Sequence, residues 1–147
     1  MNLRIVITVC SLPALLAIPQ MALANSPFKK AFDEQYVKNS GNEEFQAAFR
    51  KDGCFICHVK EREKEKEFVN HYGNELAKLI PGNVEERLDN ARKDGRDAQT
   101  AEKEKVLKEL VEAMKKVEAV KSPSGVTYGE LFKSHQLPPH EGEFSTK

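Results

Sequence analysis

Apolar residues recur three and four residues apart along most of the chain, which is the spacing of one face of a helix. Alternation of apolar and polar residues, the pattern of a half-buried strand, is absent, and Lys, Glu, Ala and Leu dominate the composition. The spacing predicts helices around five apolar groups: Phe28, Phe32 and Tyr36; Phe45 and Phe49; Phe68, Tyr72, Leu76, Leu79 and Ile80; Val106, Leu107, Leu110, Val111, Met114 and Val117; and a short last helix from Thr127 to His135. We therefore expect a small all-α domain.

Turn-forming residues separate these predicted helices. The residues between 83 and 100 are polar, and we expect a short helix there, followed by a mobile loop around Asp94-Gly95. The longest helix should span about residues 101 to 120, and residues 60 to 67, all charged, should form a solvated stretch. The helix boundaries come from these groups: Ser26-Pro27 at the first start, Asn39-Ser40-Gly41-Asn42, Asp52-Gly53, Pro81-Gly82, Ser122-Pro123-Ser124-Gly125, and Pro138-Pro139 before a polar C-terminal tail from about residue 138.

The first 24 residues have the organisation of a secretory signal peptide. Arg4 provides a short basic start, an apolar run extends from Ile5 to Ile18, and Ala22-Leu23-Ala24 is a small-x-small cleavage site. The apolar run is short for a membrane span, and Cys10 inside it should be removed with it. An uncleaved anchor is the alternative. We expect a mature domain of residues 25–147, periplasmic or otherwise exported, with no membrane span.

The charge of the chain excludes some partners. Lys and Arg number 23 and Asp and Glu number 23, so the protein is close to neutral with or without the signal peptide. A neutral chain has no strong field with which to hold nucleic acid or an anionic membrane surface. We therefore expect no nucleic-acid partner.

The residues Cys54-Phe55-Ile56-Cys57-His58 carry the most specific chemical signal in the sequence. Two cysteines separated by two residues and followed at once by histidine form the arrangement for covalent attachment of haem c. The two thiols add to the two vinyl groups of the haem, and His58 becomes the proximal ligand of the iron. The sequence therefore predicts one covalently bound haem c, held by Cys54, Cys57 and His58.

Four other interpretations of the two cysteines remain. A thioredoxin-like dithiol opens a helix after a strand, and no strand is predicted before Cys54. Structural zinc needs four ligands, and the mature chain has no second cysteine pair. A disulfide across so short a loop would constrain little of the unfolded chain. A chance match to the motif is the fourth.

The sixth ligand of the iron is left open by the sequence. His135 is predicted on the apolar face of the last helix, where iron would satisfy a ring nitrogen, and a helix-capping role is the alternative. Met114 lies on the apolar face of the longest helix, where methionine is often a core residue but can also ligate haem. His71 points away from the apolar stripe of its helix and should be a surface residue. His140 follows two prolines and is expected to be mobile. The remaining alternatives for the sixth position are a lysine or an open, water-filled site.

Three segments resemble a family of small exported mono-haem c-type cytochromes of planctomycete-type bacteria, including anammox organisms. They are KDGCFICHVK at 51–60, NHYGNELAKLI at 70–80 and TYGELFKSHQLP at 127–138. The resemblance implies a helical cytochrome c-like fold around one haem. Some relatives pair the haem histidine with a distal cysteine, bind nitric oxide or carbon monoxide, and form heterodimers. This chain has no distal cysteine in its mature part, so that ligand pair does not carry over, and His135 is its candidate substitute.

These observations favour an electron carrier over an enzyme, because no distal acid–base set is visible. The alternatives are a haem protein that binds or senses small gases (NO or CO), a small peroxidase, and the haem subunit of a larger oxidoreductase. Redox proteins are the expected partners, and the charged run 60–67 could dock them. Phe49 and Tyr72 are candidates for contact with the haem. An exposed apolar face on the long helix, Val106 to Val117, would allow a homo- or heterodimer.

Overall fold

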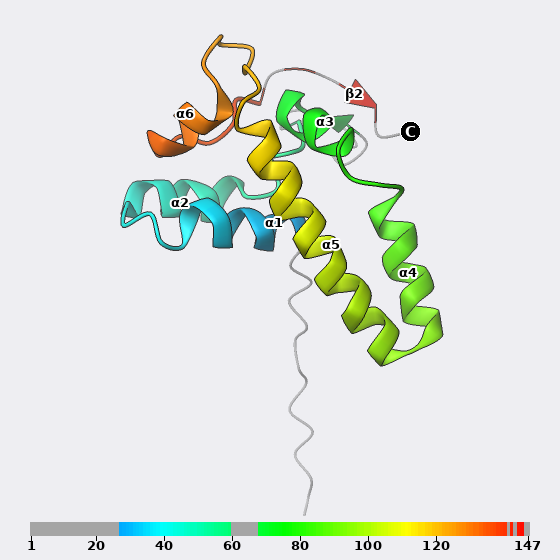
Figure 1. Ribbon diagram of the computed structural model, residues 1–147. Helices are drawn as coiled ribbons and strands as arrows, with labels where there is room; N and C mark the ends of the chain where they lie inside the picture. The colour runs from blue at the N-terminus through cyan, green and yellow to red at the C-terminus, as the bar shows by residue number, and fades with distance from the viewer. Residues whose placement is uncertain (1–26, 60–67, 141, 143, 146–147) are drawn as a thin grey trace, which may run out of the picture.

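The computed structural model describes residues 27–59, 68–140, 142 and 144–145 (Figure 1). The predicted signal peptide with Cys10, the capping residue Ser26 and the charged run 60–67 lie outside the described residues. The described chain is mostly helical, which confirms the expected all-α class. In Figure 1 the long helix α5, Arg96–Val117, crosses the middle of the molecule, with α2 and α6 on one side of it and α4 on the other.

The N-terminal helices follow the predicted pattern closely. Helix α1, Pro27–Phe32, continues directly into a π-helical segment, η1, Asp33–Val37. The π-turn adds a residue to the helical turn, and the regular spacing of the aromatic residues did not indicate it. Helix α2, Glu43–Asp52, begins after Asn42, whose side chain accepts a hydrogen bond from the Phe45 amide at 2.8 Å. An asparagine cap of this kind satisfies an amide that the helix cannot pair.

The third predicted helix is shorter than its apolar pattern. Helix α3 spans His71–Ala77, and Phe68 lies before it in the short strand β1, Phe68–Val69. Strand β1 pairs antiparallel with β2, Phe144–Ser145, which lies in the polar tail expected after residue 138. Residues 144–145 of the tail therefore lie beside β1. Leu79, assigned to the apolar stripe, is 42% exposed.

Helices α4 and α5 form a tight hairpin. Helix α4, Val84–Asp94, is followed by the single residue Gly95 and then at once by α5. The expected mobile loop is therefore wrong: Gly95 has φ 119°, a backbone conformation that glycine adopts without strain, and it makes the whole turn. Since nothing else interrupts the helix, α5 starts five residues before the predicted position and ends at Val117.

Helix α6, Tyr128–Lys133, is also shorter than predicted. Thr127 caps it, and Glu130 reaches back to the Thr127 backbone, so both halves of a capping box are formed. The helix ends before His135, which has φ 56° and an exposed side chain. The prediction that His135 lies on the apolar face of a helix is therefore wrong. A left-handed backbone at this position turns the chain away from the helix direction.

The core lies where α5 meets α1 and α3. The apolar side of α5 faces inward, and its central residues are fully buried: Val106, Leu110, Met114 and Val117. The expectation of an exposed apolar face between Val106 and Val117 is thus wrong, because α1 and α3 cover it. Among the described residues, the large apolar side chains that are exposed are Leu79 and Val126. No described helix combines the length and the apolar character needed to cross a membrane.

Candidate functional site

The two cysteines lie in a turn directly after α2. The backbone continues in hydrogen-bonded turns, with the Phe55 amide donating to Asp52 at 2.8 Å and the His58 amide donating to Cys54 at 3.3 Å. This winding holds Cys54 and His58 in one backbone turn. Both cysteines are free, Cys54 exposed and Cys57 half-buried. The segment that precedes the motif is a helix, in agreement with the absence of a predicted strand there.

The environment of Cys57 does not favour a thiolate. Burial, and then the nearby Cys54, raise the pKa of the Cys57 thiol to about 12. A catalytic dithiol needs the opposite, because a lowered pKa provides the thiolate that attacks a disulfide. The raised pKa of Cys57 therefore does not favour the redox-dithiol interpretation, and both cysteines are unpaired.

Asn70 fixes the motif turn to α3. The side chain is fully buried, and its amide donates to the Phe55 carbonyl at 3.1 Å and to the Ile56 carbonyl at 2.9 Å. Its side-chain oxygen accepts from the Gly73 amide at 2.9 Å, which caps α3. Its backbone amide donates to the Cys57 carbonyl at 2.9 Å. Asn70 was not predicted as a site residue, although an asparagine before a helix is a recognisable N-cap.

Gly73 allows the helix to approach the motif closely. A Cβ atom at this position would stand 2.3 Å from the Cys57 carbonyl oxygen and 3.0 Å from the Val69 side chain. The first distance is far inside van der Waals contact, so any larger residue would push α3 away from the cysteines. Glycine here serves close packing and not a turn, because its backbone is helical.

His58 has one ring nitrogen anchored. Its Nδ1 lies 3.1 Å from the Phe68 carbonyl, and its backbone bridges to Val69 across the end of β1. When Nδ1 donates to a carbonyl, the lone pair of the neutral ring is on Nε2. Metal-binding histidines commonly use this arrangement, because the second hydrogen bond fixes both the tautomer and the ring orientation. Nε2 is thus the ring nitrogen of His58 that carries the free lone pair.

The other candidate histidines occupy three different environments. His135 is exposed and its ring lies 5.8 Å from that of Phe45. His71, expected at the surface, is half-buried instead, with Nδ1 2.9 Å from the Tyr128 hydroxyl, so that expectation is wrong. The side of α3 that carries His71 faces Tyr128 of α6. The spacing of residues within α3 alone does not indicate this contact with another helix.

His140 is also held in place. Its Nδ1 lies 3.0 Å from the carbonyl of Phe55, inside the cysteine motif, and the two rings meet edge to face with centroids 6.3 Å apart. The expectation of a mobile residue is therefore wrong. Pro138, two residues earlier, is buried, which fixes the path of the chain to the motif.

Aromatic rings fill the space beside the motif. Phe49 and Tyr72, the two candidates for haem contact, are both buried and both pack on Phe32, at 5.9 and 6.1 Å between ring centroids. Met114 is fully buried and belongs to the same core. These residues therefore lie in one continuous apolar interior, whereas His135 lies at its edge.

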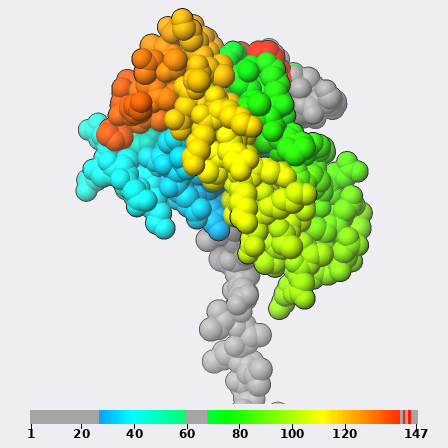
Figure 2. All heavy atoms as spheres, viewed as in Figure 1, coloured from blue at the N-terminus to red at the C-terminus, as the bar shows by residue number. Residues whose placement is uncertain are grey.

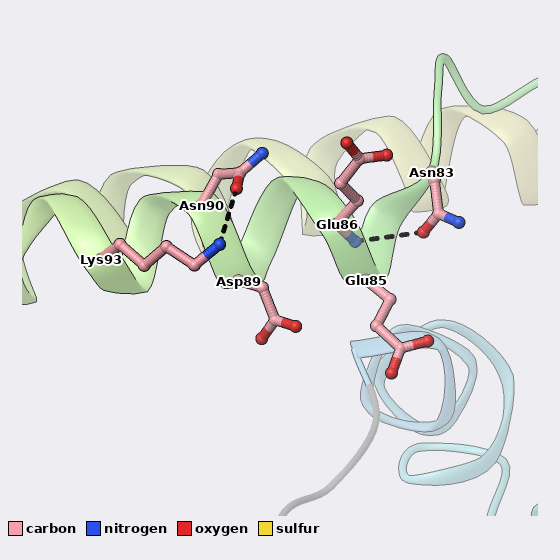
Figure 3. A pocket seen from close by; sticks show the side chains of 6 residues that line it. All are labelled: Asn83, Glu85, Glu86, Asp89, Asn90 and Lys93. Atoms are coloured by element: carbon pink, nitrogen blue, oxygen red, sulfur yellow. Dashed lines mark hydrogen bonds between the residues drawn. The ribbon is translucent and has the colours of Figure 1, made fainter.

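The α4–α5 hairpin carries two surface depressions away from the motif. The first is lined by polar and charged side chains of α4 and its cap, among them Glu85, Asp89 and Lys93, which point outward in Figure 3. The second follows the groove between α4 and α5. The first holds the hydrogen bond that caps α4, from the Glu86 amide to Asn83 at 3.1 Å. Neither depression contains a residue predicted for function.

The chain was compared with known families, proteins and structures. No family model, curated protein or solved structure matches it. The likeness to small planctomycete-type cytochromes therefore stays a prediction from the three sequence segments.

Proposed function

We propose that this protein is an exported c-type cytochrome that carries electrons through one covalently bound haem. The observation that carries this proposal is the anchored imidazole of His58, which follows two free cysteines at haem-attachment spacing in the sequence. Nδ1 is occupied by the Phe68 carbonyl, and Nε2 is left for a metal. A histidine prepared in this way within a Cys-x-x-Cys-His turn is difficult to explain as a surface feature.

The residues present fit the attachment chemistry. Each thiol would add across one vinyl group, so that a sulfur–carbon bond forms and the thiol proton goes to the other vinyl carbon. Both cysteines are unpaired, as this addition requires. Asn70 and Gly73 hold the turn rigidly against α3, and a rigid turn keeps the two sulfur atoms and His58 in one arrangement.

Haem iron, when bound, supplies a reversible one-electron change. The chain's contribution is to hold the ring, exclude water with the aromatic core, and keep His58 oriented. For the sixth position we place Met114 before His135, because Met114 is buried in that core and His135 is exposed beyond the end of α6. The expected partners are redox proteins outside the cytoplasm, either in transient complexes or as a homo- or heterodimer.

The proposal is tested by producing the full chain with a c-type haem assembly system. We expect a mass increase of one haem that survives denaturation, and sharp reduced bands that carbon monoxide does not shift. Cys57→Ala should lose most of the covalent haem, and His58→Ala should lose the low-spin spectrum. His135→Ala, the matched histidine control, should keep both. Absence of covalent haem in the unchanged chain would refute the proposal, and a spectrum shifted by carbon monoxide would favour the gas-binding alternative.

A further inference from the structure

Tyr72 has an unusual hydroxyl group. The residue is fully buried on α3, and within the described part of the chain its hydroxyl has no hydrogen-bond partner. The two neighbouring tyrosines do have partners: the Tyr36 hydroxyl donates to Glu118 at 2.8 Å, and the Tyr128 hydroxyl lies 2.9 Å from Nδ1 of His71. Buried polar groups in folded proteins are nearly always paired, so the Tyr72 hydroxyl calls for an explanation.

The ring of Tyr72 is held firmly by its neighbours. It lies 4.9 Å from the ring of Tyr128, 5.6 Å from Phe132 and 6.1 Å from Phe32, measured between centroids. Contacts on several sides leave the ring no freedom to swing its hydroxyl into water. Simple adjustment of the side chain therefore cannot satisfy the group, and a partner would have to come to it.

Tyr72 lies next to the cysteine motif. Tyr72 precedes Gly73, the residue that packs on the Cys57 carbonyl. Burial, and after it the nearby Cys57, raise the pKa of Tyr72 well above its usual value. The other polar groups that face it, Tyr36, Tyr128 and Glu118, act in the same direction. Each group that acts on the pKa of Tyr72 in the described part of the chain raises it, so the hydroxyl is suited to donate a hydrogen bond and unsuited to bind iron itself.

We propose that Tyr72 is a positioning residue whose hydroxyl donates a hydrogen bond to an oxygen or nitrogen lone pair that arrives with the haem. This inference rests on the proposed haem attachment at Cys54 and Cys57. The acceptor belongs either to a propionate carboxylate or to a ligand on the iron. In both cases the donor stabilises the more negative, reduced state of the haem, and the hydroxyl is unpaired only until the haem is attached.

The test compares the haem-loaded protein with its Tyr72→Phe variant, which removes only the hydroxyl. At a fixed electrode potential we expect the ratio of ferrous to ferric haem to fall about fivefold, the effect of losing one hydrogen bond. The thermal midpoint of the loaded protein should also fall. In the haem-free chain the same substitution should raise stability, because it removes an unpaired buried group.

Tyr36→Phe is the matched control, since its hydroxyl already has a partner in the chain. It should destabilise loaded and haem-free protein alike and leave the ferrous-to-ferric ratio unchanged. Azide titration of the ferric protein and of its Tyr72→Phe variant separates the two acceptors. Weaker azide binding in the variant indicates that the hydroxyl donates to a ligand on the iron. A shifted ferrous-to-ferric ratio with unchanged or absent azide binding indicates that it donates to a propionate. If the haem-loaded Tyr72→Phe variant keeps its covalent haem, shows an unchanged ferrous-to-ferric ratio and is more stable than the parent, the inference is overturned. If the parent chain binds no covalent haem, the proposed function itself is refuted.

Discussion

Two asparagines in the same local position show how different the two halves of this molecule are. Asn70 and Asn83 each cap a helix by accepting a backbone amide, at 2.9 and 3.1 Å. Asn70 is fully buried and also ties two carbonyls of the cysteine turn to α3. Asn83 is exposed, and no further hydrogen bond of its side chain is found in the described structure. One sequence signal thus clamps the cysteine turn in one half and only caps the start of a helix in the other.

The helices around these asparagines differ in the same way. Beside the motif, α1, α3 and α6 bury aromatic rings against one end of α5. Helix α4 has no buried residue, and it lies against the other end of α5 as a separate lobe in Figure 2. Arg87 holds that lobe through ion pairs to Glu102 and Glu109, at 2.6 and 2.7 Å. The half with the cysteine turn is therefore held by buried aromatic packing, and the hairpin by ion pairs together with the partly buried Val84 and Leu88.

The largest difference between the halves should appear when each cap is removed. Asn70→Ala deletes three hydrogen bonds to buried groups, and we expect a loss of about 3 kcal/mol in the free energy of unfolding. Asn83→Ala should cost about 1 kcal/mol, the usual value for a helix cap. Urea unfolding of both variants checks this. Equal losses of stability in the two variants would mean that the hydrogen bonds from Asn70 to the cysteine turn add nothing to its role as a helix cap.

A smaller effect is expected from breaking the ion pairs of the hairpin. Arg87→Met should destabilise the protein by about 1 kcal/mol, because both carboxylates lose a partly buried partner. Hydrogen exchange should speed up at the amides of α4 and stay unchanged at α3. High salt should reduce the difference between variant and parent, since it screens the parent's ion pairs. Faster exchange at α3 would show that the halves are coupled.

The smallest effect concerns pH at the start of α6. Hydrogen bonds from the Thr127 hydroxyl and backbone lower the pKa of Glu130 below its usual 4.5. A lowered folded-state pKa stabilises the protein above pH 4.5, and this stabilisation is lost as the pH falls through the folded-state value. Glu130→Gln should therefore lower the urea midpoint slightly at pH 7, and this difference should shrink as the pH falls below 4.5. Glu112→Gln, at an exposed position of α5, is the control and should not show this pH dependence.

The sequence predicted those elements whose signals are local. The spacing of Phe28, Phe32 and Tyr36 placed the first helix, and the apolar side of the long helix was assigned correctly from Val106 to Val117. Both depend on neighbours three or four residues apart along the chain. The errors lie where distant segments meet. Phe68 joined a strand because residues 144–145 pair with it, and no local pattern reports that pairing.

The sequence by itself determined the helical class, the helix boundary at Asn39-Ser40-Gly41-Asn42, the helix start at Thr127, and the spacing of Cys54, Cys57 and His58, because each depends on a few consecutive residues. The tertiary structure alone decided which nitrogen of His58 is anchored, that Asn70 clamps the cysteine turn, and that the Tyr72 hydroxyl is left without a partner. These features arise from contacts between residues at least ten positions apart or from burial by several helices. Their energies depend on the assembled core, which local spacing does not encode.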